Sequence, residues 1–199
     1  MYSYRETDKL MEPLTRKIVR EFGKLKRSVL AFDDINKLKN ATNECYAACH
    51  TATIQTYVKI AKHYYKECGG TGDTVINILF IDLMLNDYDP VTKYIFATEW
   101  DRKRARAVES IIGGRNPKDV DTAMKYLHGQ IRQWGDEVTD NAVLTAYADK
   151  GIKKVKWKTE EDSRVCKECG ELNDKVFPIK SVPDKPHIGC RCRLIPLLT

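Results

Sequence analysis

The sequence predicts an α+β protein, with a mainly helical body over residues 1–150 and a small C-terminal Cys/His module of short strands over residues 151–199. Three observations support this prediction. Apolar residues recur at helical spacing through the first part, an apolar–charged alternation begins after Gly151, and four of the seven cysteines lie in the last 34 residues. A chain of 199 residues is long enough for a helical core with a small appended module.

The first predicted helix is amphipathic and runs from Leu14. Its apolar face consists of Leu14, Ile18, Phe22, Leu25 and Val29. Its opposite face carries a basic stripe made of Arg16, Arg20, Lys24 and Arg27. An apolar stripe at this spacing is typical of a helix that packs on a core. We interpret the basic stripe as a solvated face, with contact to DNA or to a partner as the alternative.

A second, long helix is predicted to begin after Asp33 or Asp34, either of which can cap it, and to reach about Tyr65. Gly69 and Gly70 are suited to end it, because glycine readily adopts the left-handed conformation found at helix C-termini.

Cys45 and Cys49 lie four residues apart on this helix and therefore share a face. Neither His50 nor His63 completes a metal-binding set with them at matching spacing. Because a free cysteine behaves as a small hydrophobic residue, we expect both thiols in the core.

Three further helices are predicted before residue 150. They are a short apolar helix capped by Asp73, a helix around Trp100–Arg106, and a long helix that is capped by Asn116, begins at Pro117 and ends at Lys150. The middle one places four positive charges in five residues, from Arg102 to Arg106. Such a patch suits phosphate or an acidic partner. Aromatic residues that could stack on bases are not interleaved with these cations, since Trp100 is the one aromatic residue beside them.

Charge and hydropathy limit the function classes. The net charge is +6, with +4 over residues 1–30, −2 over the middle and +4 over residues 151–199. Basic ends suit contact with nucleic acid or with an acidic protein surface, and also serve simply for solubility. No apolar run reaches about 18 residues, so no membrane span is expected. The first residues lack the apolar core of a secretory signal, so we expect folding in a cytosol.

The last 34 residues carry a metal-binding pattern. Cys166 and Cys169 are separated by two residues, and after seventeen intervening residues His187 begins a segment that contains Cys190 and Cys192. Two such pairs at this separation fit tetrahedral zinc, which takes four sulfur or nitrogen ligands. A short, proline-rich segment buries little surface, so a structural metal would supply folding free energy. The alternative is a metal-free module in which the thiols and His187 pack internally.

Five candidates compete for four ligand positions. We favour Cys166, Cys169, His187 and Cys190, because both pairs then have two intervening residues. The main alternative replaces His187 with Cys192. Neither set leaves an open coordination site, which favours a structural zinc over a catalytic one.

The same segment resembles the end of head-morphogenesis proteins of tailed bacteriophages, of the Mu F type and SPP1 type. In Val155–Cys169 a tryptophan is followed by an acidic turn and then by Cys-x2-Cys. Leu172–Phe177 gives a leucine, a polar turn and a hydrophobic residue, and Pro186–Cys192 gives a proline followed by His-x2-Cys-Arg-Cys. With the preceding helix and Arg193–Pro196, the resemblance covers about residues 131–197. Residues 1–120 carry no matching feature.

This resemblance implies a minor capsid protein, present in few copies and acting in head morphogenesis. It implies association with the portal protein and other capsid proteins, and it allows sequence-independent contact with packaged DNA. The expected location is the virion, at the capsid interior or portal vertex, and the host cytoplasm during assembly. No catalytic activity is expected.

Two other functions are alternatives to a role in head assembly. A nucleic-acid-binding zinc module would use Trp157 for base stacking together with a set of cations. Those cations are Lys153, Lys154, Lys156, Lys158, Arg191 and Arg193. We expect Trp157 in the core instead, because Val155 shares its face. A toxin-like enzyme would need a site such as a Cys192–His187 nucleophile pair, for which no third orienting group is evident. The His-x-Glu tripeptide of zinc deaminases is absent.

Overall fold

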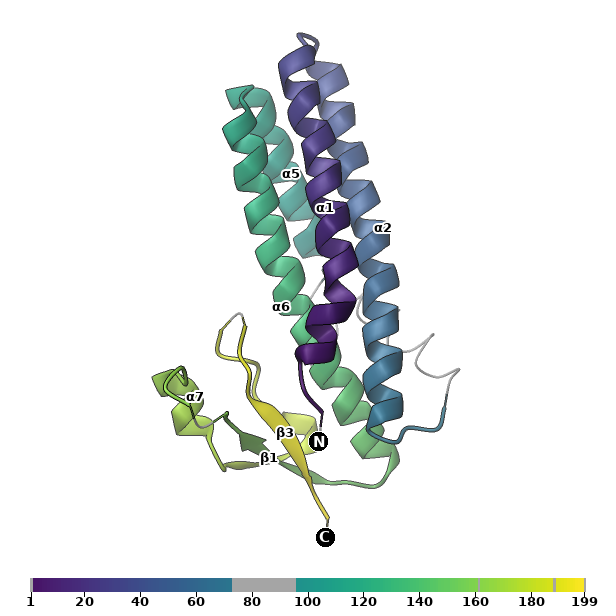
Figure 1. Ribbon diagram of the computed structural model, residues 1–199, viewed down its shortest axis with the longest axis vertical. Helices are drawn as coiled ribbons and strands as arrows, with labels where there is room; N and C mark the ends of the chain where they lie inside the picture. Colours follow the sequence, from purple (N-terminus) through teal and green to yellow (C-terminus); the bar gives the residue numbers. More distant parts are fainter. Residues whose placement is uncertain (1, 73–95, 161, 188, 199) are drawn as a thin grey trace.

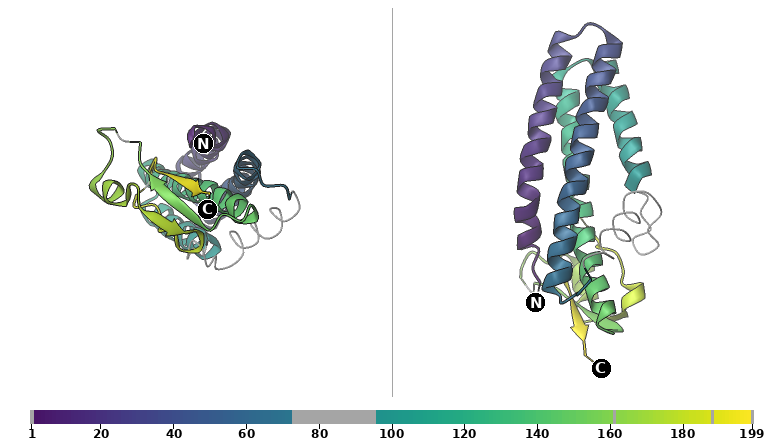
Figure 2. Two further views of the ribbon diagram at one scale, coloured as in Figure 1. Left: turned by 90° about the horizontal axis from the view of Figure 1, so that it is seen from below. Right: turned by 90° about the vertical axis from the view of Figure 1, so that its right-hand side faces the viewer.

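The computed structural model describes residues 2–72, 96–160, 162–187 and 189–198 (Figure 1). Within these residues four long helices lie alongside one another. A small sheet lies at the end of the bundle where α6 ends (Figure 2). The elements are α1 (Arg5–Ala31), α2 (Ile35–Glu67), α5 (Phe96–Gly114), α6 (Pro117–Asp149), β1 (Lys154–Lys158), α7 (Lys167–Leu172), β2 (Val176–Pro178), a 3-10 turn (Ile179–Ser181) and β3 (Arg193–Leu197). This arrangement confirms the predicted α+β class.

Helix α1 buries the predicted apolar face and exposes the predicted basic stripe. It begins at Arg5, nine residues before the expected start at Leu14. The first two turns were missed because a buried polar residue, Thr7, interrupts their apolar pattern. The backbone N–H of Thr7 donates to the hydroxyl oxygen of Tyr64 at 3.0 Å, which satisfies it inside the bundle.

Helix α2 begins as predicted. The side chain of Asp34 accepts hydrogen bonds from two backbone N–H groups of the first turn. The helix ends at Glu67, and Gly69 follows in the left-handed region with a φ of 85°. Cys45 and Cys49 are buried, which confirms the expectation of core thiols.

Helix α6, like α2, contacts each of the other three long helices. Asn116 caps it and Pro117 occupies its first turn, as predicted. It ends at Asp149, and Gly151 turns the chain with a φ of 75°. The indole ring of Trp134 is fully buried at the centre of this helix.

The predicted short helix capped by Asp73 lies outside the described residues, whereas the basic patch lies on α5. Two of its arginines form ion pairs within that helix. Arg102 pairs with Glu99 at 2.5 Å, and Arg104 pairs with Asp101 at 3.2 Å. No described helix is long and apolar enough to cross a membrane.

The sheet has the order β2-β1-β3, with β1 antiparallel to both neighbours. Val155 and Trp157 point to the buried face of β1, as the alternation predicted. Trp157 is 1% exposed and contacts Phe177 edge to face, with 6.4 Å between ring centroids. The stacking surface considered for a nucleic acid is therefore enclosed.

The small module packs on the bundle through a buried polar network. The Tyr2 hydroxyl accepts from the backbone N–H of Leu194 and donates to a carboxylate oxygen of Asp140, at 3.0 Å each. Asp140 also accepts from the Tyr4 hydroxyl and pairs with Lys185 at 3.3 Å. The change of pattern near residue 150 thus marks a change of secondary structure, while one continuous core crosses it.

Candidate metal centre

Helix α7 fixes the first pair of candidate ligands. Cys166 is its N-cap residue, and the Cys166 sulfur accepts the backbone N–H of Cys169 at 3.4 Å. This turn brings the two side chains to the same side, with Cys169 in the first turn of the helix. The sequence predicted the turn but not the helix, which spans six residues.

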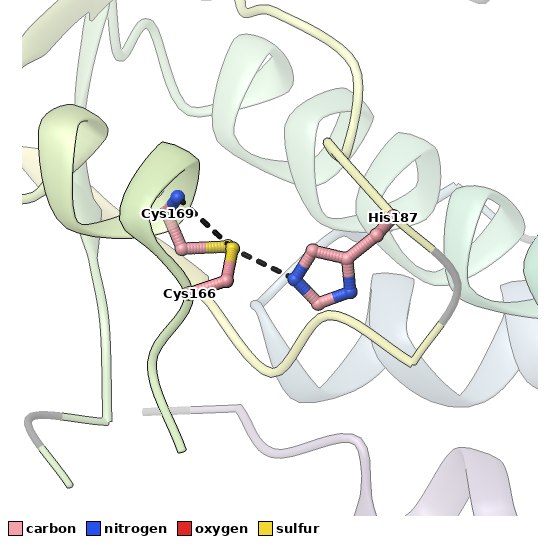
Figure 3. Close-up of side chains that lie close together, drawn as sticks. All are labelled: Cys166, Cys169 and His187. Atoms are coloured by element: carbon pink, nitrogen blue, oxygen red, sulfur yellow. Dashed lines mark hydrogen bonds between the residues drawn. The ribbon is translucent and has the colours of Figure 1, made fainter. Parts of the chain in front are cut away.

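The second group of candidates comes from the loop that leads into β3. His187 precedes Gly189, whose φ of 73° lets the chain reverse before Cys190. Figure 3 shows His187 facing Cys166 and Cys169 of the α7 turn across the gap between the two segments. The predicted ligand segments, eighteen residues apart in the chain, are therefore brought together.

Cys169 lies at the centre of the candidate cluster. Its sulfur is 3.3 Å from His187 Nε2 and 3.6 Å from the Cys190 sulfur. In a tetrahedral zinc site, bond lengths of about 2.3 Å to sulfur and 2.0 Å to nitrogen place neighbouring ligand atoms about 3.5–3.8 Å apart. The observed separations fit a shared metal ion, and all seven cysteines are free thiols.

The five candidate ligands form two overlapping groups of three. One is Cys166, Cys169 and His187, and the other is Cys169, Cys190 and Cys192. Within each group the ligand atoms lie within 4.8 Å of one another. Among the described residues, no four of these atoms meet that limit together. The cluster could hold a metal ion, and Cys169 belongs to every such arrangement.

The environments of the four thiols differ. Burial raises the pKa of Cys169 to about 12, whereas the backbone N–H of Cys169 lowers the pKa of Cys166. A hydrogen bond between Cys190 and Cys192 raises the pKa of Cys190 and lowers that of Cys192. Several thiolates this close repel one another, so a cation bound between them would compensate their charge.

Carboxylates neutralise most of the cations around the cluster. Asp162 receives a bidentate hydrogen bond from Arg191 at 2.7 and 2.8 Å, which holds the pKa of this carboxyl far below its usual range. Arg193 pairs with Glu160 at 3.2 Å. On the sheet, Asp174 pairs with Lys156 and Lys158. These ion pairs reduce the net positive charge of the surface that was a candidate for nucleic-acid binding.

The Cys192–His187 nucleophile pair considered from the sequence is not the pair that the geometry favours. His187 groups with Cys166 and Cys169, whereas Cys192 groups with Cys169 and Cys190. Cys169, whose sulfur lies 3.3 Å from His187 Nε2, is 3% exposed. A buried thiol with a raised pKa is a poor nucleophile.

The sequence did not predict the polar network that connects the candidate metal centre to the helical bundle. The Lys185 ammonium donates to the backbone oxygen of Cys192 and lies 5.0 Å from the ring centroid of Trp157. It therefore connects the loop of the second ligand group to Asp140 of the bundle. One signal was present in the sequence: Asp136 and Asp140 fall on the buried stripe of α6, where apolar residues are expected.

Searches against protein-family models, curated proteins and solved structures found no match for this chain. The function is therefore inferred from the residues and their geometry.

Proposed function

We propose that this protein is a minor head protein of a tailed bacteriophage, acting in head morphogenesis without catalytic turnover. One observation carries the proposal. Within the segment that resembles the family, residues 131–197, the Cys-x2-Cys turn and the His-x2-Cys-x-Cys loop converge on Cys169. These are the residues on which the resemblance was based.

The proposed cofactor is one structural zinc ion, held by Cys169 and three of the other four candidates. Zinc suits sulfur and imidazole ligands in tetrahedral geometry, and it would supply folding free energy to a module whose described residues form three short strands. Lys185 would position the ligand loop, because it donates a hydrogen bond to the backbone oxygen of Cys192 and pairs with Asp140 of the bundle.

Zinc binding is tested by the metal content of the purified full chain. We expect about one zinc per chain, and loss of the metal in Cys169→Ala, because this thiol belongs to both ligand groups. Cys68→Ala is the matched control, since Cys68 is a half-buried free thiol at the end of α2. A metal-free wild-type protein, or equal metal content in both variants, would contradict the assignment.

The assembly role is tested with the portal protein of the same phage. The two full-length proteins are co-expressed with a tag on one of them, and the complex is recovered over a range of salt. We propose that the portal protein, other capsid proteins and, without sequence preference, packaged DNA are its partners, at the portal vertex or capsid interior. Stable recovery supports the role. No recovery at any salt, with zinc still bound, would separate the zinc site from head assembly and refute the portal contact.

A further inference from the structure

A hollow lies in the bundle, away from the Cys/His cluster. It has a volume of about 430 Å³ and opens between α5 and α6. Its floor consists of Tyr46, Ala107, Ala123 and Leu127, all buried. Two of these are alanines, one on each helix, so short side chains leave the space unfilled. Pockets for small ligands have volumes of about 300–1,000 Å³.

The rim of this hollow carries two cations that form no ion pair with any described residue. They are Lys103 and Arg106, three residues apart on α5. The other arginines of the patch have partners, since Arg102 pairs with Glu99 and Arg104 with Asp101. Like charges at this spacing repel each other on a helix.

Among the residues that line the hollow, Asp119 is the carboxylate, and it forms no ion pair with these two cations. Asp119 accepts a hydrogen bond from the side-chain amide of Asn116 at 2.7 Å and lies in the first turn of α6. Burial lowers the pKa of Lys103; attraction to Glu99 opposes this shift, and repulsion from Arg102 and Arg106 adds to it. A bound anion would remove this unfavourable arrangement.

The opposite rim provides an aromatic face and a hydroxyl group. Tyr126 of α6 is 71% exposed, and Thr122 lies one turn before it. Phosphate is recognised by paired lysine and arginine side chains, and bases stack on exposed aromatic rings. We propose that this hollow binds a nucleotide, with its phosphate between Lys103 and Arg106 and its base on Tyr126.

Two sources could supply this chemistry, a free nucleotide or the end of a nucleic acid strand. Calorimetric titration of the full-length protein with ADP and with an oligothymidylate of about eight nucleotides distinguishes them. Tighter binding of ADP identifies a free nucleotide, and tighter binding of the oligonucleotide identifies a strand. Inorganic phosphate is the third probe. If it binds as tightly as ADP, the base is not recognised and the proposal is wrong.

Matched variants on α5 locate the site. Arg106→Ala and Lys103→Ala should each weaken binding at least about tenfold, and Tyr126→Ala should weaken it about fivefold or more. Arg102→Ala removes an equal charge from the same helix, but one already paired with Glu99, and should change binding less than about twofold. Equal losses in Arg102→Ala and Arg106→Ala would reveal general charge attraction and overturn the site. So would no binding of any probe at about 1 mM.

Discussion

Replacing Lys185 with methionine tests the polar network that joins the module to the bundle. The ammonium of Lys185 and the carboxylate of Asp140 are 3.3 Å apart, with side chains 6% and 13% exposed. Methionine keeps much of the side-chain length and removes the charge, so Asp140 stays buried with the hydroxyls of Tyr2 and Tyr4 as its remaining partners. Breaking a buried ion pair on one side costs about 3–5 kcal/mol.

The lower end of that range applies here, because the two tyrosine hydroxyls still donate to Asp140. A loss of about 3 kcal/mol is a large part of the usual stability of a domain, about 5–15 kcal/mol. With a urea m-value of about 2 kcal/mol per molar, the midpoint should fall by about 1.5 M. Urea titration followed by tryptophan fluorescence measures this change, and Trp157 lies beside Lys185.

Two further variants make the test specific. Lys167→Met removes a lysine that is 91% exposed, and should change the free energy of unfolding by less than about 0.5 kcal/mol. The double variant Lys185→Met with Asp140→Asn removes both charges and should recover at least about 1 kcal/mol relative to Lys185→Met. If Lys185→Met is as stable as Lys167→Met, the network does not hold the module and the reasoning is refuted.

Three other predictions concern two buried carboxyl groups, a buried hydroxyl group and two glycines. Burial raises the pKa of Asp136 to about 7 and of Glu137 to about 8. Because the folded state then binds more protons than the unfolded state, the free energy of unfolding should fall from about pH 5 to about pH 8. Urea titrations of Asp136→Asn across this range should show a smaller fall. A fall as steep as that of the wild-type protein would contradict this prediction. Tyr2→Phe removes a hydroxyl with two buried hydrogen bonds and should destabilise the protein by about 1–3 kcal/mol in the same assay, so a neutral effect would argue against the packing of the first residues. Gly151 has a φ of 75° and open space where a Cβ would lie, so Gly151→Ala should lower the free energy of unfolding by about 1 kcal/mol. Gly129→Ala, in the middle of α6, should raise it by up to about 1 kcal/mol. Thermal unfolding measures both changes, and a shift of the same sign in the two variants would contradict the prediction.

Local features of the sequence determined the helix boundaries that were predicted well. Asp34 and Asn116 cap their helices with their own side chains, and Gly69 and Gly151 supply the left-handed residues after the helix ends. Such signals act within a few residues of the chain, so they can be read without knowing the fold. The alternation that buries Trp157 is local in the same way.

The sequence also determined the candidate ligands but not their arrangement. The spacing of Cys166, Cys169 and the segment from His187 predicted a Cys/His cluster of five candidates. The tertiary structure divided them into two groups that share Cys169, because the ligand loop meets the α7 turn at this residue. Which thiol becomes central depends on how two loops pack, and spacing within each loop does not specify that.

Contacts between distant parts of the chain were decided by the tertiary structure alone. Tyr2 and Asp140 are 138 residues apart and share a hydrogen bond, and Lys103 and Tyr126 meet at one hollow from two different helices. Helical periodicity gives the face on which a residue lies but not the residue opposite it. A buried charge such as Asp140 is tolerated only where packing brings its partner, and that partner is chosen by the fold rather than by neighbouring residues.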